Sequence, residues 1–238
     1  MTTVEKRELL GEGKAKKIYA TSDPEKLIFY FKDDATAFNA KKKGTIESKG
    51  ILNNRISQRF FELLAAHGIP SHFLAEVGER EMLVRKLRII PCETVVRNVV
   101  TGSLRKRLGR TDGEVLPRPI VEFYYKSDEL DDPMINDDHA IVFGWASASE
   151  LAEIRRQALA VNEVLRKFMA ERDVLLVDFK LEFGRTPDGT VLLADEICPD
   201  TCRFWDAKTH ERLDKDRFRH DLGNVEGAYE EIMRRVAT

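Results

Sequence analysis

Three charged residues alternate with apolar residues in the segment 177–184, which reads Val-Asp-Phe-Lys-Leu-Glu-Phe-Gly. Because successive side chains of a strand point to opposite faces, a strand here would carry Asp178, Lys180 and Glu182 on one face. Taken alone, such a face is most often exposed to solvent and held by a ladder of ion pairs. The alternative is one wall of a cleft that binds charged substrates.

A second pair of carboxylates follows a predicted return strand. We expect a strand at 191–197 and a hairpin turn at 185–189, where Pro, Asp and Gly occur together. The hairpin brings Asp195 and Glu196 back beside the first cluster, and the register decides which of them faces inward. Several carboxylates beside a lysine are costly without a cation, whereas oxygen ligands from two strands suit Mg²⁺ that carries substrate phosphates. The pattern therefore favours a cleft for a metal-bound nucleotide.

The N-terminal segment 10–19 combines glycines with lysines, in the order Leu-Gly-Glu-Gly-Lys-Ala-Lys-Lys-Ile-Tyr. Backbone amides near Gly13, together with Lys14 and Lys16, are suited to holding phosphates. The segment is not a Walker loop, and Lys16 stands where a Rossmann motif has its third glycine. An ordinary glycine hairpin followed by a charged strand is an equally good interpretation.

An arginine lies inside the apolar run Val-Val-Arg-Asn-Val-Val of the segment 90–103. We expect Arg97 to need an anionic partner, because a partly buried guanidinium is costly without one. The residues Thr101, Gly102 and Ser103 open a predicted helix, where hydroxyls and free amides favour a phosphate or carboxylate. The alternative for Ser103 is a helix N-cap.

Further basic residues occur where predicted loops meet helices or strands. Lys126 ends a predicted strand, Arg203 lies in a loop-like segment, and Lys215 and Arg219 lie at a helix start. Each alone is typical of surface charge. The charged stretch 33–44 likewise predicts a solvated loop, although a loop between a strand and a helix can close over a ligand.

Hydrophobic periodicity predicts the elements that position these clusters. Besides the hairpin strands, which begin at Val174 and Val191, strands are expected at 27–31, 82–86, 94–100 and 121–125. Helices are expected at 49–67, after Ser149 as far as Phe168, and at 214–222 and 225–236. Gly and Pro predict a loop at 109–119. Strands and helices do not alternate regularly, so the order favours an α+β fold.

The composition is that of a globular protein of 238 residues, formed as one large domain or two small lobes around a cleft. The 39 Lys and Arg nearly balance the 41 Asp and Glu, so the chain has no overall basic field. We therefore expect it not to bind nucleic acid. Without an apolar leader or a run of about 18 apolar residues, we expect a cytoplasmic protein with no membrane partner. The three cysteines, Cys92, Cys198 and Cys202, are interpreted as reduced thiols, because they are odd in number and lack the spacing of a disulfide framework. We expect no metal site from them, because structural zinc needs four such ligands.

Over essentially its whole length the sequence resembles the phosphoribosylaminoimidazole-succinocarboxamide synthase (SAICAR synthetase) family. Residues 13–16 match its nucleotide loop, 96–98 with 102–103 its central motif, and 177–184 its most specific signature. Further matches follow in the family's order at Asp195, Glu196, Pro199, Asp200, Arg203 and 214–219. The chain departs from some bacterial relatives in a substrate-side loop, where Phe38-Asn39 replaces Gly-Asp.

The resemblance implies a two-lobed α+β fold similar to ATP-grasp and kinase-like enzymes, with ATP between the lobes. We expect a mainly β lobe at 1–87 with the nucleotide loop and an α+β lobe at 88–238 with the substrate and metal sites. The implied reaction belongs to de novo purine biosynthesis. It joins L-aspartate to 5-amino-1-(5-phosphoribosyl)imidazole-4-carboxylate (CAIR), giving SAICAR, ADP and phosphate.

The resemblance also implies residue roles. ATP is expected to bind Gly13, Lys14, Ala15, Lys16, Lys126, Glu182 and Asp195. The last two of these would hold Mg²⁺. CAIR is expected to bind Arg97, Ser103, Asp178, Lys180 and Arg203, of which Asp178 and Lys180 would be catalytic, and the Lys215 and Arg219 pair is a weaker candidate. The sequence is compatible with a homo-oligomer.

Two other functions remain open on the residues alone. A small-molecule or inositol-type kinase would share the cleft but leave the phosphate on a hydroxyl, so ADP release that depends on aspartate would exclude it. A nucleotide-binding regulatory module would release no phosphate at all.

Overall fold

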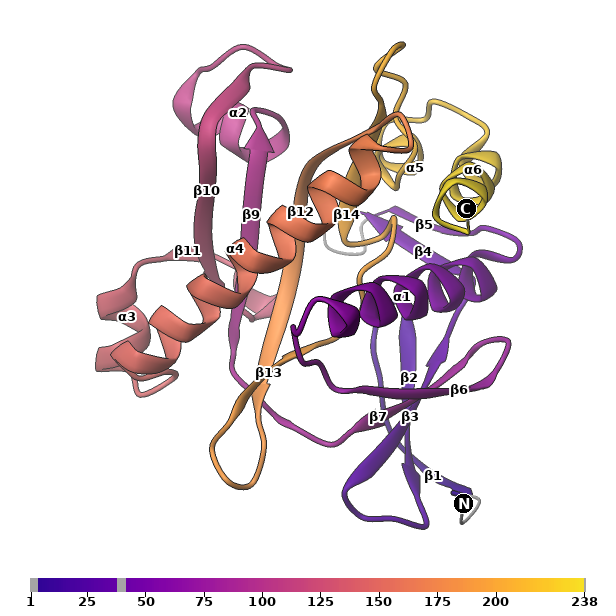
Figure 1. The fold of residues 1–238 in the computed structure, drawn as a ribbon, viewed down its shortest axis with the longest axis vertical. Helices are drawn as coiled ribbons and strands as arrows, with labels where there is room; N and C mark the ends of the chain where they lie inside the picture. The colour runs from indigo at the N-terminus through magenta and orange to yellow at the C-terminus, as the bar shows by residue number, and fades with distance from the viewer. Residues whose placement is uncertain (1–3, 38–41, 238) are drawn as a thin grey trace.

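The computed structural model describes residues 4–37 and 42–237. Its N-terminal part is built on a five-stranded antiparallel sheet (Figure 1). The strand order is β1-β2-β3-β7-β6, with bounds β1 Lys6–Glu12, β2 Lys16–Thr21, β3 Lys26–Phe31, β6 Phe73–Gly78 and β7 Glu81–Arg85. Helix α1 (Lys49–Ala66) packs on this sheet, and its buried Phe61 stacks on Phe73 of β6 with ring centroids 5.8 Å apart. The predicted strand at 27–31 and helix at 49–67 are confirmed.

The second sheet has seven strands, in the order β11-β10-β9-β12-β13, with β8 and β14 also paired to β12. Its strands are β8 Arg88–Ile89, β9 Cys92–Val99, β10 Val115–Tyr125, β11 Met134–Ile135, β12 Val174–Arg185, β13 Val191–Ala194 and β14 Cys202–Asp206. The long helix α4 (Ala148–Ala170) crosses this sheet (Figure 1). The proposed lobe boundary after residue 87 lies between the two sheets, and the division itself stays a prediction.

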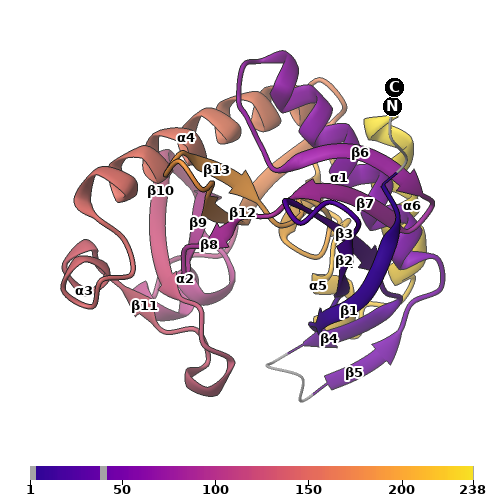
Figure 2. The same cartoon turned by 90° about the horizontal axis from the view of Figure 1, so that it is seen from below.

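Short elements complete the fold. They are the ribbon β4 (Asp34–Ala37) with β5 (Lys42–Thr45), a 3-10 turn η1 (Asp128–Leu130), α2 (Gly102–Leu108), α3 (Asp137–Val142), α5 (Asp216–Arg219) and α6 (Val225–Val236). The ribbon lies beside the first sheet in Figure 2. Its two strands lie where the sequence predicted a solvated loop, so that prediction is wrong for 34–37 and 42–44, where the two segments pair with each other. The predicted Phe38-Asn39 departure lies outside the described residues.

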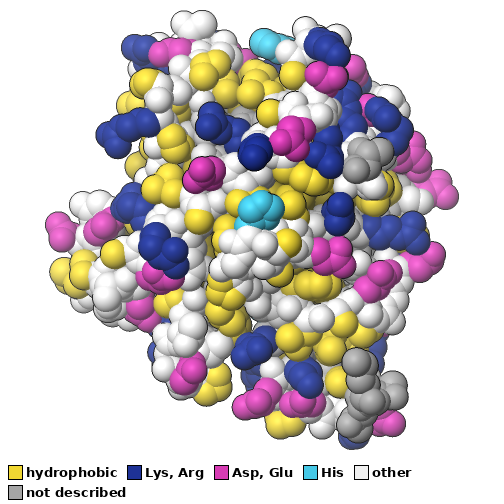
Figure 3. Space-filling model, viewed as in Figure 1, with side chains coloured by type: hydrophobic (Ala, Val, Ile, Leu, Met, Phe, Trp, Pro, Cys, Tyr) yellow, Lys and Arg dark blue, Asp and Glu magenta, His cyan; other side chains and the backbone are white. Residues whose placement is uncertain are grey.

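One hydrophobic core joins the two sheets. Phe60 of α1 meets Phe168 of α4 and Phe204 of β14, each with ring centroids 6.2 Å apart. The core therefore fixes the cleft walls relative to each other. On the surface, basic and acidic side chains are interspersed over the face drawn in Figure 3, as the near-balanced charge predicts.

Four predicted boundaries are wrong. Strand β10 begins at Val115, inside the predicted loop. Its first half pairs with β9 across an irregular register between Val115 and Ile120. Prolines, which lack an N–H, are tolerated at such an irregularity. Helix α4 is capped by Ser147, which forms a capping box with Glu150, and not by Ser149. Strand β13 ends at Ala194, and α5 is a single turn in place of the helix predicted at 214–222.

All three cysteines are free and buried. Within the described ranges, no helix has the length and apolar character needed to cross a membrane.

Candidate active site

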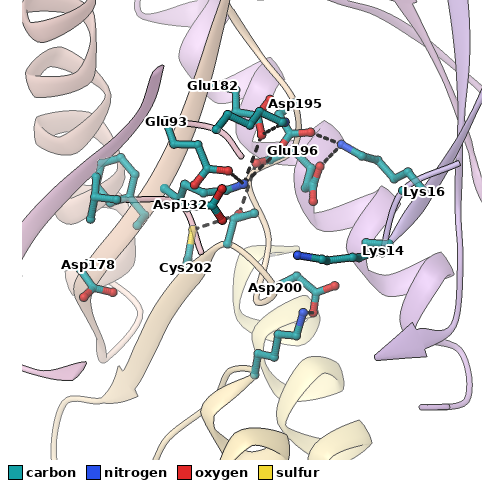
Figure 4. A pocket seen from close by; sticks show the side chains of 18 of the residues that line it. Lys14, Lys16, Glu93, Asp132, Asp178, Glu182, Asp195, Glu196, Asp200 and Cys202 are labelled. Atoms are coloured by element: carbon teal, nitrogen blue, oxygen red, sulfur yellow. Dashed lines mark hydrogen bonds and ion pairs between the residues drawn. The ribbon is translucent and has the colours of Figure 1, made fainter. Parts of the chain in front are cut away.

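A cleft of about 540 Å³ lies where the β1–β2 turn of the first sheet faces strands β9 and β12 of the second (Figure 4). Asp178, Lys180 and Glu182 of β12 all line it, as the period-two pattern predicts, while Leu181 and Phe183 point into the core. The face with three charges is therefore a cleft wall and not a solvated strand face.

The hairpin from β12 to β13 returns two carboxylates to this wall. The register pairs Glu182 with Ala194, after which the strand ends because Asp195 adopts a left-handed backbone with φ of 66°. As a result the carboxylates of both Asp195 and Glu196 contact the ammonium of Lys16 (Figure 4). The sequence left open which of the two faces inward, and the answer is both.

A second ammonium group lies among the same carboxylates. Lys180 Nζ lies 3.0 Å from Glu93 Oε1, 3.2 Å from Glu182 Oε1 and 3.9 Å from Asp195 Oδ2. Burial disfavours this ammonium, but the carboxylates, Glu182 first, outweigh burial and raise the pKa of Lys180 well above its ordinary value. Lys126 Nζ approaches Glu182 Oε1 to 2.5 Å from the cleft mouth. Lysines and carboxylates thus alternate through this end of the cleft.

Asp195 and Glu196 differ in their readiness to bind a proton. Burial and then the Asp195 charge raise the pKa of Glu196 to about 7. Lys16 and Lys180 outweigh burial at Asp195 and hold its pKa below the ordinary value. Asp195 is therefore the permanently charged member of the pair.

The oxygen donors at this end fit Mg²⁺ in the form in which it accompanies a nucleotide. Glu182 and Asp195 both lie within 4 Å of Lys180 Nζ, so the two carboxylates are close together. Among the described residues, no group of three or more His, Cys, Asp or Glu side chains is arranged to hold a metal by itself. Mg²⁺ commonly takes one or two carboxylates and completes its shell with phosphate oxygens and water.

The glycine segment forms the turn between β1 and β2, closed by a hydrogen bond of 2.8 Å from Gly13 N–H to the Lys16 carbonyl. Gly13, Lys14, Ala15 and Lys16 all line the cleft. Lys14 Nζ lies 2.8 Å from Asp128 Oδ1 on the opposite side. The glycine hairpin and the lysine-bearing cleft loop, stated as alternatives above, are the same feature.

The other end of the cleft is built around Arg97, which is 3% exposed. Its guanidinium donates to Glu122 at 2.7 Å, Asp178 at 2.9 Å, the Ser103 hydroxyl at 2.9 Å and the Tyr124 hydroxyl at 3.1 Å. The predicted anionic partner therefore comes from the chain itself. Helix α2 is capped at Thr101, so the N-cap interpretation of Ser103 is wrong.

A second guanidinium holds the same carboxylate. Arg203 lies in strand β14, where it pairs with Asp178 of β12, and not in the predicted loop. It donates to Asp178 at 2.9 Å and to Asp216 at 2.8 Å. It lies against Gly102, whose φ is 52° and where an added Cβ would stand 3.0 Å from the guanidinium. Only glycine allows both this backbone and this approach. Asp178 is thus oriented from two sides.

The comparison with known proteins identifies the family. A family model described as SAICAR synthetase matches residues 9–236. The chain belongs to this family. Phosphoribosylaminoimidazole-succinocarboxamide synthase of Brevibacillus brevis is 58% identical over 233 residues, covering 98% of each chain. A solved SAICAR synthetase (Type-2) in complex with ADP is 54% identical, with a TM-score of 0.93 and coverage of 96% of this chain and 97% of that one. The synthase from Ehrlichia chaffeensis is 46% identical, with a TM-score of 0.95 and coverage of 97% and 98%.

Membership of the SAICAR synthetase family confirms the α+β fold and the activity predicted from the sequence. The chain is a ligase with SAICAR synthase activity in de novo purine biosynthesis. A kinase or a regulatory module is no longer an alternative.

All of the residues predicted for the SAICAR synthetase site line the cleft except Ser103. Ser103 is joined to a cleft residue by the hydrogen bond that its hydroxyl accepts from Arg97. Lys215 and Arg219, the weaker candidates, also line it. What each side chain binds stays a prediction.

Several residues of the cleft were missed. Glu93 shares the face of Arg97 by the same period of two, so the pattern could have revealed it. Asp200, which was matched to the family but not predicted as a site residue, lies on the cleft wall. It accepts hydrogen bonds from the fully buried Lys49 at 2.6 Å and from the Tyr229 hydroxyl at 2.7 Å. No local sequence pattern could predict the ion pair between Lys49 and Asp200, because 151 residues separate them.

His72 was also missed. Its ring is 2% exposed, and Nε2 lies 2.9 Å from the carbonyl of Asp195. Burial first, and the Lys16 ammonium second, lower the pKa of His72 to about 4, so the imidazole is neutral at physiological pH.

Proposed function

We propose that ATP and Mg²⁺ bind at the lysine–carboxylate end of the cleft and CAIR at the arginine end. The observation that carries this proposal is the course of β12, which places Glu182 at the first end, Asp178 at the second and Lys180 between them. Four residues of strand span about 13 Å. One strand can therefore bring a phosphoryl group and a carboxylate together at its centre. Small-molecule substrates and a cytoplasmic location remain the predicted context.

At the nucleotide end, Lys14, Lys16 and Lys126 supply positive charge to the phosphates. The ADP bound by a solved relative of 54% identity supports a nucleotide here. Glu182 and Asp195 would hold Mg²⁺, which, when bound, neutralises charge on the phosphates. With Asp195 serving the metal, Lys16 would be available to a phosphate oxygen.

At the ribonucleotide end, Asp178 is held by Arg97 and Arg203 and faces the cleft. Arg203 also donates to the other oxygen, Oδ1, at 3.1 Å. Because guanidiniums hold both oxygens, we assign Asp178 an orienting role, as acceptor of hydrogen bonds from CAIR. Arg203, Lys215 and Arg219 form the more accessible cationic rim and suit the ribose phosphate.

The reaction needs an activated carboxylate, because a carboxylate oxygen is a poor leaving group. The CAIR carboxylate oxygen attacks the γ-phosphorus of ATP, the bond to the β-phosphate oxygen breaks, and ADP leaves with its electron pair. Lys180 stabilises the charge that accumulates between the two ends. The amine of aspartate then attacks the acyl carbon, loses a proton, and expels inorganic phosphate to form the amide.

Oxygen labelling tests this route. With CAIR labelled by ¹⁸O in its carboxylate, one labelled oxygen should appear in inorganic phosphate for each amide formed. Phosphate free of label would rule out the acyl phosphate. ADP release, measured with CAIR in the presence and absence of L-aspartate, tests the substrate assignment in the same preparation.

A further inference from the structure

We propose that His72 is a positioning residue for the nucleotide end of the cleft, whose imidazole holds the backbone turn that directs Asp195 and Glu196 together at Lys16. This inference rests on the proposed function, in which Asp195 serves the metal-bound nucleotide.

The turn needs support because its backbone is unusual. Asp195 has φ of 66°, in the left-handed region that residues with a Cβ rarely adopt. An extended backbone here would send the side chains of Asp195 and Glu196 to opposite faces, so that only one carboxylate could reach Lys16. The left-handed residue is therefore what allows both carboxylates to contact the same ammonium.

The support comes from the other sheet. His72 Nε2 lies 2.9 Å from the Asp195 carbonyl oxygen. Since a carbonyl oxygen only accepts, Nε2 carries the proton and donates. The bond joins the segment before β6 directly to the residue that follows β13.

The donor is rigid. The His72 ring is 2% exposed and lies edge-on to Phe29 and Phe61, with centroid separations of 5.4 Å and 5.5 Å. Its backbone N–H donates to the Leu193 carbonyl at 2.8 Å, and its own carbonyl accepts from Arg85 N–H at 2.7 Å. Both sheets therefore hold the His72 backbone, while the two aromatic rings and the Asp195 carbonyl hold its imidazole.

In this arrangement the carboxylates of Asp195 and Glu196 have different roles. When Asp195 serves the metal-bound nucleotide, Glu196 is the partner that still holds Lys16 in the cleft. Loss of the His72 hydrogen bond should therefore weaken nucleotide binding and leave CAIR binding, at the far end of β12, unaffected.

The test compares two substitutions. His72→Phe keeps the aromatic packing and removes the donor, whereas His72→Gln places an amide N–H at the same number of bonds from Cα. We expect His72→Phe to weaken Mg²⁺-ADP binding in calorimetry, and to raise KM for ATP, about tenfold, the equivalent of one lost hydrogen bond. KM for CAIR should not change, and His72→Gln should recover most of the loss. His67→Phe, at an exposed histidine, is the matched control.

A merely structural role gives another result. If His72→Phe lowers Tm but leaves ADP affinity and KM for ATP as in the wild type, or if His72→Gln fails to recover them, the inference is wrong. Should His72→Phe not fold, ¹⁵N spectra of the wild-type imidazole decide: a protonated Nε2 supports the inference and a protonated Nδ1 overturns it.

Asp195→Asn, measured in the same calorimetric assay, separates the two proposals. If Asp195→Asn weakens Mg²⁺-ADP binding but His72→Phe does not, only the role of His72 fails. If Asp195→Asn also binds normally, the proposed nucleotide end itself is wrong.

Discussion

Replacing Glu182 by glutamine should reduce turnover strongly without unfolding the protein. Glu182 Oε1 lies 2.5 Å from Lys126 Nζ and 3.2 Å from Lys180 Nζ, and its side chain is 5% exposed. Glutamine keeps the shape and one oxygen acceptor but removes the charge that the two lysines and the proposed Mg²⁺ share. A charged hydrogen bond contributes about 1.5–3 kcal/mol.

The expected effect on kcat follows from that energy. If about 2–3 kcal/mol of transition-state stabilisation is lost, kcat falls roughly 30- to 150-fold, since about 1.36 kcal/mol corresponds to a factor of ten. Steady-state ADP release at fixed CAIR and aspartate, titrated with Mg²⁺ or Mn²⁺, measures the loss. Because the substitution removes a proposed metal ligand, excess metal should restore part of the activity.

Glu93→Gln is the matched control. Glu93 Oε1 lies 3.0 Å from Lys180 Nζ, so this substitution also removes a charge beside Lys180, yet Glu93 is not a proposed metal ligand. We expect a smaller loss of kcat and no rescue by metal. Near-normal kcat for Glu182→Gln at ordinary Mg²⁺, or equal metal rescue of both variants, would refute the assignment.

Three further predictions address other parts of the molecule. Arg97→Ala should raise KM for CAIR far more than KM for ATP, because it releases the carboxylate at the ribonucleotide end, and Lys14→Ala should show the opposite bias; equal changes in both constants would contradict the division of the cleft. Gly102→Ala should raise KM for CAIR and lower Tm, because Gly102 has φ of 52° and the new Cβ would lie 3.0 Å from the Arg203 guanidinium. In the control Gly109→Ala, φ is 62° and no atom lies within 4 Å of the new Cβ, so this variant should show the backbone strain alone. Arg185 donates to the Glu150 carboxylate at 2.9 Å. This hydrogen bond first, and those from Ser147 at the start of α4 after it, lower the pKa of Glu150 from 4.5 to about 2. The carboxylate therefore stabilises the fold above pH 4.5, and this contribution disappears as the pH falls toward 2. Urea unfolding as a function of pH should therefore show a smaller acid-dependent loss of stability in Glu150→Gln than in the wild type. Equal losses of stability in the two proteins would contradict the role of the ion pair between Glu150 and Arg185.

The sequence by itself determined the features that depend on local backbone geometry. The period of two placed Asp178, Lys180 and Glu182 on one face, and β12 carries them there. The spacing of apolar residues likewise located α1, with Ile56 among its buried residues. The order of the motifs was sufficient to recognise the family, because family motifs are local strings of residues.

Tertiary structure decided which side chains meet across the chain. Arg97 finds Asp178 over a separation of 81 residues, because β9 and β12 are adjacent in the sheet and pair these two residues in register. Sequence spacing demanded an anion near Arg97 but could not say that the chain supplies it.

The same limit applies to the end of β13. An uninterrupted strand through Asp195 and Glu196 would have divided the two carboxylates between opposite faces. The left-handed backbone at Asp195, supported by a hydrogen bond from His72, directs both of them at Lys16. Such a turn is stabilised by a partner 123 residues away in the chain, so only the packed fold reveals it.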